Sequence, residues 1–291
     1  MVDSALIVQQ MLNGLLFGGQ LALVAVGLTL IWGVTRILNF AHGAMIMIGG
    51  YLGLFTYRAT GNALLAIPVA VLGLFVIGVA TESLVVRQLR TRDDSELAAI
   101  IGTFGLAVVA ENAIRVTLSS DRESLPSILT GIWEVGPIIL VKEQVLLFGV
   151  ALCALGALFG LIKYTRLGMA MRAVAQDRES ALLMGVRSDR IYAVTFGLSA
   201  ALAGLSGVLL APVFNIYPSV GWQPFLLAFI VVIIGGLGSV RGTLVAALLL
   251  GVIRSLSLTW VSAQQTQIVL FVAMILILAV RPSGLSGVVE S

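Results

Sequence analysis

The sequence has little charge and almost none of the residues used for disulfide or metal chemistry. Only 11% of its 291 residues are charged, whereas soluble domains carry roughly a quarter, and it contains one cysteine and one histidine. A lone cysteine, Cys153, excludes an intrachain disulfide framework, and these two residues cannot form a zinc site of several thiolates or imidazoles. We therefore expect no metal centre, and we expect Cys153 to pack as a small hydrophobic residue.

Nucleotide-binding and catalytic motifs are also missing. No G-x-x-x-x-G-K-[ST] sequence occurs, and the glycine cluster GGLGSVRG places Arg241 where a dinucleotide fingerprint needs its third glycine. No nucleophile is accompanied by a plausible base. No basic patch interleaved with aromatic residues suggests nucleic-acid binding. The sequence predicts a protein that is not an enzyme, has no catalytic residues and binds no cofactor of its own.

Long apolar runs are abundant instead, and hydrophobic residues make up 59% of the chain. Because a spanning helix needs about 20 mostly apolar residues, we predict an all-α, polytopic transmembrane helix bundle that forms a single domain over residues 1–291. It would have about 8 to 10 spans, including short or broken helices. The provisional spans are 6–34, 38–57, 62–86, 96–118, 138–162, 191–213, 222–236, 242–260 and 266–281.

The basic residues predict how the chain is oriented in the membrane. Arginines follow the third span, and the connection over residues 164–190 contains several more. Retained positive charge marks the cytoplasmic side of a membrane protein. We therefore predict an N-terminus outside, a C-terminus in the cytoplasm, and a cytoplasmic loop over residues 164–190.

The 32 glycines suggest both close helix packing and a break in one helix. Small residues four apart let helices approach closely in lipid, and four such pairs are Gly14/Gly18, Gly49/Gly53, Gly156/Gly160 and Gly238/Gly242. The denser cluster from residue 235 to 242 predicts a break or tight turn. We take Gly235, Gly236 and Gly238 as candidate residues of a pathway or gate.

Polar residues inside the predicted spans have two interpretations. Glu111 and Arg115 are spaced to pair on one helix face, but Glu111 and its neighbour Asn112 are also candidates for lining an outer vestibule. Glu82 and Arg254 lie near the ends of spans. Most polar residues near span ends need no functional explanation, and we assign none to these two.

The only histidine lies at the predicted start of the second span, at the inner membrane interface. There we expect Asn39 to cap the helix and His42 to be its third residue. The alternative is that Asn39, His42 and Gly43 line the inner gate of a transport pathway, because polar breaks between spans often lie on such pathways. The sequence leaves both interpretations open.

The loop over residues 164–190 predicts a short amphipathic helix from Arg172 to Met184, ended by Gly185. Val174, Ala181, Leu182 and Met184 would form its apolar set. One interpretation is a helix that lies in the headgroup layer. The other is a helix whose apolar face docks in a groove of a cytoplasmic partner.

Three blocks in this order, NFAHGAMIMIGGY, RAVAQDRESALLMGVRSDRIYAVTF and IVVIIGGLGSVRGTLVAALLLGVI, carry a family resemblance. Together they make nearly the whole chain resemble the H-type permease subunits of bacterial ABC importers for branched-chain amino acids. The resemblance implies a bacterial cytoplasmic (inner) membrane location and a partner permease that is homologous but different, giving a heterodimer. It also implies two cytoplasmic ATPases, which would bind ATP and Mg²⁺, and a periplasmic substrate-binding protein.

By this resemblance the loop would transmit ATP-driven movement, and its coupling residues would be Arg172, Ala173, Asp177, Glu179, Ala181 and Gly185. The cargo would be branched-chain or other small hydrophobic amino acids. Related permeases carry urea, amides or aromatic acids, so these cargoes stay open. An ATP-independent channel or secondary transporter for a small neutral solute is the remaining alternative.

Overall fold

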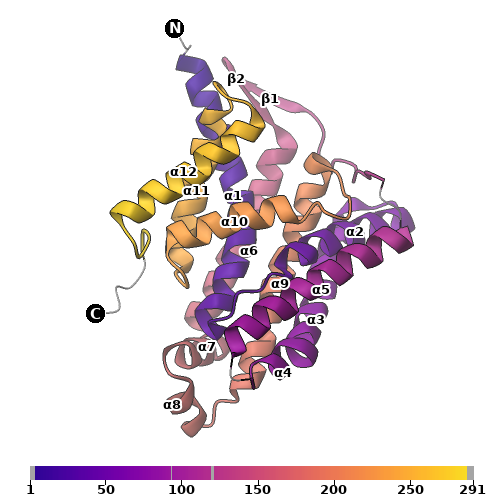
Figure 1. The fold of residues 1–291 in the computed structure, drawn as a ribbon. Coiled ribbons are helices and arrows are strands. Elements are labelled where there is room, and N and C mark those ends of the chain that lie inside the picture. The colour runs from indigo at the N-terminus through magenta and orange to yellow at the C-terminus, as the bar shows by residue number, and fades with distance from the viewer. Residues whose placement is uncertain (1–3, 93, 119–120, 287–291) are drawn as a thin grey trace.

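The computed structural model describes residues 4–92, 94–118 and 121–286 and shows a helical bundle (Figure 1). Three long helices run side by side through it: α1 (Ser4–Thr35), α6 (Lys142–Tyr164) and α9 (Ser188–Phe214). The predicted all-α, polytopic architecture is confirmed.

Helices α1 and α9 form the core: half of the residues of α1 and most of those of α9 are buried. Glycine lets neighbouring backbones reach them: Gly14 lies against Val252 of α11 (Val240–Ser257), and Gly49 of α2 (His42–Thr60) lies against Gly204 of α9. Two of the expected packing pairs therefore do pack. Gly156 has open space beside it within the described chain, so the packing expected there does not occur inside this subunit.

The outer helices expose apolar side chains, as expected for surfaces that face lipid. They are α3 (Ala66–Thr81), α5 (Ser95–Leu118) and α12 (Ala263–Val280). A 3-10 turn (Ala63–Leu65) precedes α3, and a π-helical turn (Glu82–Val86) and α4 (Arg87–Leu89) continue it. Seven helical stretches of the described residues are long and apolar enough to cross a membrane.

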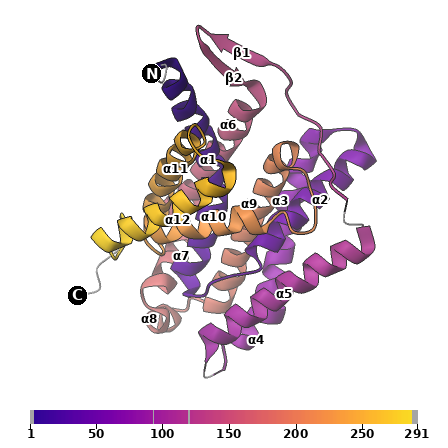
Figure 2. The same cartoon turned by 45° about the horizontal axis from the view of Figure 1, so that its top comes forward.

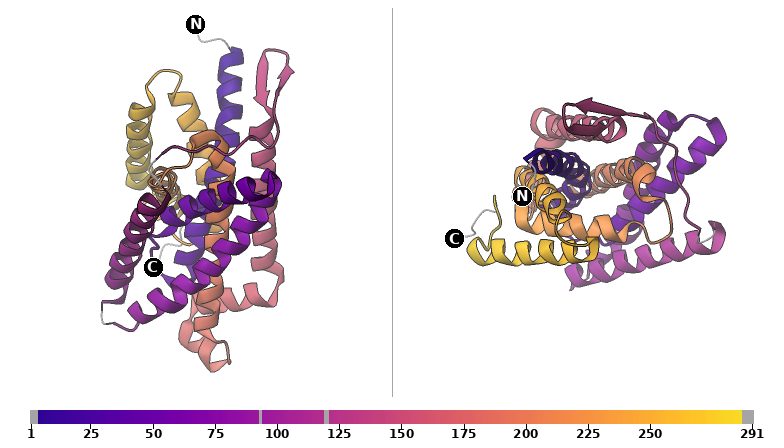
Figure 3. Two further views of the ribbon diagram at one scale, coloured as in Figure 1. Left: turned by 90° about the vertical axis from the view of Figure 1, so that its right-hand side faces the viewer. Right: turned by 90° about the horizontal axis from the view of Figure 1, so that it is seen from above.

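Helix α10 (Trp222–Gly235) is too short to cross a bilayer and lies crosswise to α1 (Figures 1 and 3). Its 14 residues extend about 21 Å, less than the roughly 30 Å hydrocarbon layer. The sequence expectation that the bundle includes short helices is met here. The first turn of α10 packs against the first turn of α2, where the backbones at Gly221 and Gly43 are in direct contact.

A β-hairpin replaces the predicted beginning of the fifth span. Strands β1 (Ile132–Val135) and β2 (Ile138–Val141) pair antiparallel, and helix α6 begins only at Lys142. Gly136 takes a positive φ of 61° in the turn, and β-branched residues flank it. The hairpin lies beside the first turns of α1 (Figure 2), where the Gln9 side-chain amide bonds both N and O of Ile139 at 2.8 and 2.7 Å.

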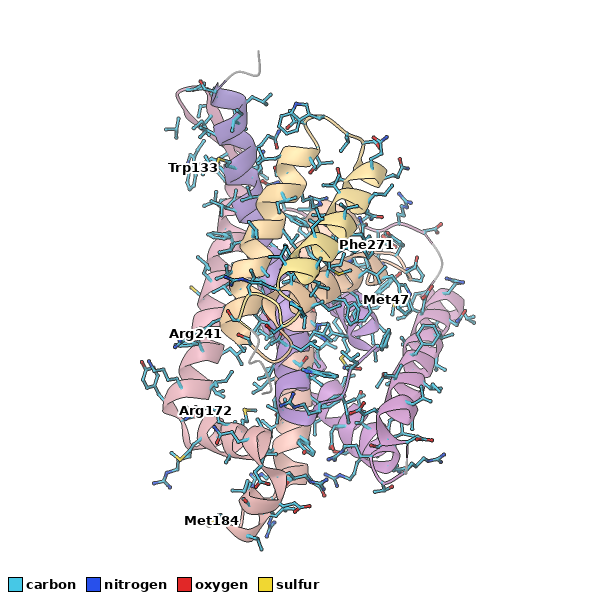
Figure 4. All side chains as sticks on the ribbon, turned by 60° about the vertical axis from the view of Figure 1, so that its left-hand side comes forward. Met47, Trp133, Arg172, Met184, Arg241 and Phe271 are labelled. Atoms are coloured by element: carbon cyan, nitrogen blue, oxygen red, sulfur yellow. The ribbon has the colours of Figure 1, made fainter. Side chains whose placement is uncertain are left out.

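The loop between α6 and α9 lies at the opposite end of the molecule from the hairpin (Figure 4, Met184 and Trp133). It contains two helices, α7 (Arg166–Gln176) and α8 (Arg178–Leu183). The predicted single helix from Arg172 to Met184 is therefore wrong. Asp177 has an extended backbone (φ −151°, ψ 107°) and interrupts the helix there.

Candidate functional site

An apolar cavity lies among α1, α2, α9, α10 and α11. The centre of a water-sized sphere can move over about 40 Å³ inside it, and the empty space reaches about 670 Å³ when the solvent at its open mouth is included. Most of its wall is aliphatic, including Leu21, Val24, Ile46, Leu210 and Leu227. Among the described residues, no aspartate or glutamate lines it. The cavity therefore suits a small hydrophobic group, and none of its described side chains offers a carboxylate to a cation.

Polar groups are few in this cavity: Asn215, Tyr217, Gln223 and Arg254. The Arg254 guanidinium lies over the Phe17 ring, 4.0 Å from its centroid. Arg254 was assigned no function because it lies near the end of a span, and no expectation included Asn215, Tyr217 or Gln223. The only signal for Arg254 was a charge in an apolar run, and its place in a cavity depends on contacts between distant helices.

His42 lies beneath the cavity and is fully buried, with an exposed fraction of 0%. Its Nε2 is 3.1 Å from the carbonyl oxygen of Val24, a residue of the cavity wall. A carbonyl only accepts, so Nε2 carries the hydrogen of this bond. The Nδ1 atom is 3.4 Å from Oγ of Ser199, whose hydroxyl donates to the Gly27 carbonyl at 2.7 Å. The imidazole thus links α1, α2 and α9.

This position corrects the expected place of His42. Val24 lies about 16 Å along α1 from the end of that helix at Thr35, so His42 is near the middle of the bundle. It does not lie at the end of the bundle, where it was expected. The chain returns from the end of α1 through residues 36–41 and begins α2 at this depth, which the apolar sequence pattern did not reveal.

Asn39 is not the cap of α2 that was expected. Helix α2 begins at His42, and the residue before it is Ala41. The buried Asn39 side chain instead accepts a hydrogen bond from the Ala41 amide at 3.0 Å, and the Asn39 carbonyl accepts from the His42 amide at 3.3 Å. Asn39 therefore forms the tight turn that sets where α2 begins.

Gly43 and Glu111 line one small recess beside α10. The predicted ion pair is present, with Glu111 Oε1 accepting from Arg115 at 2.7 Å. The Trp222 indole also donates to Glu111 Oε2 at 2.9 Å, which joins α5 to α10. Asn112 is elsewhere: its side chain is exposed and donates back to the Val108 carbonyl at 2.8 Å.

Gly235, Gly236 and Gly238 lie at the far end of α10 from this recess and do not line the cavity. The predicted break is present, since Gly236 and Gly238 take positive φ angles of 95° and 86°. A Cβ on Gly242 would lie 1.9 Å from the Gly235 carbonyl oxygen. These glycines let the chain turn sharply from α10 into α11.

A buried ion cluster lies where α3 is continued by the π-helical turn. Glu82 is fully buried and contacts Arg90 at 2.5 Å and Arg87 at 3.6 Å. Arg90 also lies 3.4 Å from Asp189 and stacks on the Tyr192 ring at 4.3 Å. The cluster ties the π-helical turn to the first turns of α9.

The predicted coupling loop is shaped by its own caps. The Asp177 carboxylate accepts from the amides of Glu179 and Ser180 at 2.9 and 3.1 Å, which begins α8. The Ser180 hydroxyl also donates to this carboxylate, and these bonds hold the pKa of Asp177 below its usual value. Gly185 ends α8 with φ 83°, and the Val186 amide donates to the Ala181 carbonyl in a Schellman-type turn.

The apolar residues expected on one face of this loop point in two directions: two are buried and the others face outward. Val174 and Ala181 are buried against Val34, Ile191 and Tyr192 of the long helices. Leu182, Leu183 and Met184 face outward, and the last two are 89% and 85% exposed. We call these three residues the tip surface.

The remaining predicted coupling residues have different surroundings. Arg172 donates to the Ile162 carbonyl at the end of α6, Ala173 is half-buried, and the Glu179 side chain is exposed. Leu183 was not among the expected apolar residues. That set assumed one straight helix, and the bend at Asp177 gives α8 a different direction.

No group of three or more potential metal ligands occurs in the part of the chain that the structure describes.

Comparisons with known proteins agree with this architecture. Residues 10–280 match the family model described as "Branched-chain amino acid transport system / permease component". The chain is 33% identical to the high-affinity branched-chain amino acid transport system permease protein LivH of Salmonella typhimurium, over 96% of this chain and 95% of that protein. It is 31% identical to BraD, the corresponding Pseudomonas aeruginosa protein, over the same shares.

A more distant relative is named for a different cargo. The ribose import permease protein RbsC of Escherichia coli is 26% identical over 88% of this chain and 80% of that protein. No solved structure matches the chain. With the helical bundle and its apolar cavity, the match over residues 10–280 shows that this multi-pass protein of the cytoplasmic membrane belongs to the branched-chain amino acid transport system permease family, the membrane subunits of ABC importers.

Proposed function

We propose that this permease moves branched-chain or other small hydrophobic amino acids through its cavity, and that ATPase subunits docked on the tip surface drive the movement. The observation that carries the proposal is the exposure of Leu183 and Met184, at 89% and 85%, on a loop beyond the ends of α6 and α9. Clustered apolar side chains at such an exposed end mark an interaction surface.

The charges around the tip surface are mostly positive and favour a partner whose groove is lined by acidic residues. Four arginines and one acidic residue, Asp189, are among the described residues that line a hollow beside Leu182; the arginines are Arg87, Arg178, Arg187 and Arg190. Complementary charge speeds and orients docking. An amphipathic helix in a groove is a common recognition mode, and α8 would present its apolar tip with a basic rim.

The packing of the loop gives a route from the partner to the cavity. Ala181 of α8 is buried in one cluster with Val34 of α1 and Tyr192 of α9. Helices α1 and α9 also supply cavity walls, including Val24 and Leu210. A partner that holds the loop differently in two states would therefore change how α1 and α9 pack at the cavity. A conformational change requires such a difference in contacts between its two states.

The division of labour follows from the family. ATP and Mg²⁺ would bind on the ATPase subunits, a second homologous permease would complete a heterodimer, and a periplasmic binding protein would deliver cargo at the hairpin end. Arg172, Ala173, Asp177, Ala181 and Gly185 would shape the coupling loop, and the tip surface with Glu179 would contact the ATPase.

Leu183→Asp combined with Met184→Asp tests the docking role. We expect loss of ATPase copurification and at least a tenfold fall in ATP-driven leucine uptake into proteoliposomes, because two charges would be buried without partners. Val135→Asp, at a 62% exposed apolar position of the hairpin, is the matched control and should leave copurification intact. Undiminished ATP-driven uptake by the double variant, or uptake that needs no ATP, would contradict the proposal.

A further inference from the structure

Arg254 is a charged group at an apolar cavity without an acidic partner. Its guanidinium stacks on Phe17, and no described carboxylate lies within 4 Å to form an ion pair with it. A charge within a membrane helix is costly and generally pairs with another group. Arg115, another arginine within a long helix, is by contrast paired with Glu111. Arg254 therefore has its planar fork of donors available to a ligand.

Another part of the cavity wall, at the end of α9, carries partial negative charge, opposite in sign to Arg254. Helix α9 ends at Phe214, where Asn215 takes a positive φ of 56° and breaks the helix. Ala211, Phe214 and Asn215 all line the cavity. The last carbonyl groups of a helix lack intrahelical donors, and they carry the negative end of the helix dipole. This wall favours an ammonium group.

Between these groups the wall is aliphatic. Leu21, Val24, Ile46 and Leu227 extend the cavity toward the level of His42. An aliphatic side chain of a few carbons fits such a surface and gains roughly 0.8 kcal/mol for each buried methylene. One cavity thus combines a site for a carboxylate, a site for an ammonium group and an apolar compartment.

We propose that Arg254 binds the carboxylate of a zwitterionic α-amino acid, with the ammonium group toward the carbonyl end of α9 and the apolar side chain in the aliphatic compartment. An arginine fork matches a carboxylate in bidentate geometry. The inference rests on the proposed transport function and narrows its cargo. Urea and simple amides have no carboxylate, so they would not use this residue.

The test measures equilibrium binding of radiolabelled leucine to the purified full importer in nanodiscs, without the periplasmic binding protein. Competitors are 4-methylpentanoate, which lacks the amine of leucine, and 3-methylbutylamine, which lacks its carboxylate. We expect Arg254→Gln to weaken leucine and 4-methylpentanoate binding by about tenfold or more, the scale of one charged hydrogen bond. The affinity for 3-methylbutylamine should stay the same.

Two further variants separate this role from general damage. Arg254→Lys keeps the charge but loses the bidentate fork, so we expect an intermediate affinity for leucine. Arg58→Gln removes a cation already neutralised by Glu123 at 2.7 Å, and it should bind leucine like the unmodified protein. Size-exclusion profiles establish that each variant complex is assembled.

Unchanged leucine affinity in Arg254→Gln would overturn the inference, and so would an equal loss for 3-methylbutylamine. ATP-driven uptake of urea, with no leucine binding by the unmodified importer, would overturn it while leaving the ATPase coupling intact. Conversely, Arg254-dependent leucine binding without ATP-driven uptake would support the carboxylate site and contradict only the coupling proposal.

Discussion

Glu82 shows how one buried carboxylate can hold a membrane helix end together. It is fully buried, and it neutralises Arg90, whose side chain is only 11% exposed, at 2.5 Å. Arg87 is the second cation at 3.6 Å. Glu82 was assigned no role because it lies near the end of a span. The structure gives it one, because Arg87 begins α4, Arg90 directly follows that helix, and Arg90 connects the cluster to α9 through Asp189.

Glu82→Ala should lower the free energy of unfolding by about 3–5 kcal/mol, because it leaves buried positive charge without its main partner. Denaturant unfolding in detergent micelles measures this loss. The matched control is Glu123→Ala: its partner Arg58 is 52% exposed, so we expect less than about 1 kcal/mol. Equal losses in the two variants would show that the Glu82 cluster contributes no more than a surface pair.

At the scale of elements, the crossing of α2 and α10 depends on two glycines. A Cβ on Gly221 would lie 1.9 Å from the Gly43 carbonyl oxygen, and backbone cannot move aside as a flexible side chain can. This contact sets where α10 begins, and Gln223 and Pro224 of its first turn line the cavity. The close approach therefore positions part of the cavity wall.

Gly221→Ala should destabilise the protein by about 1–3 kcal/mol through overpacking. It should also weaken leucine binding, because α10 must shift. Gly149→Ala is the control, since a Cβ there meets nothing within 4 Å, and removing a helical glycine favours the helix by roughly 0.5–1 kcal/mol. Melting temperatures of the two purified variants should move in opposite directions. A shift in the same direction would contradict the steric argument.

Local patterns in the sequence predicted local features well. The ion pair of Glu111 with Arg115 follows from their spacing on one helix, and the predicted span of residues 96–118 is close to α5 (Ser95–Leu118). Features that depend on distant segments were not predictable. The depth of His42 is set by its contacts with Val24 and Ser199, and neither neighbour is marked by a motif.

The helix boundaries show the same limit. The predicted fifth span begins at residue 138, so strand β2 (Ile138–Val141) was taken for the first turn of a helix, although the polar pair Lys142 and Glu143 separates this apolar run from the rest of α6. The bend at Asp177 was predictable in principle, because aspartate is a strong helix cap. However, the helix-forming residues on both sides of Asp177 predicted one continuous helix instead.

For the whole molecule, the core helices connect the two ends. Helices α1 and α9 pack against the coupling loop through Val34 and Tyr192, and against the cavity through Val24 and Leu210. His42 joins the same two helices in between, through the Val24 carbonyl and Ser199. The bundle therefore contains one continuous packed route from the tip surface to the cavity, and this route bears on transport only if the tip surface faces the cytoplasm.

Single-cysteine labelling checks that orientation, since the hairpin and the tip surface lie at opposite ends of the molecule (Figure 4). Cys153 is the native cysteine and is exposed on α6, so Cys153→Ala gives the background. We expect a membrane-impermeant maleimide to label Val135→Cys in intact spheroplasts and Met184→Cys only in inverted vesicles, because the arginines around the tip surface favour the cytoplasmic side. The reverse pattern would place the tip surface outside the cell and exclude its docking to a cytoplasmic ATPase.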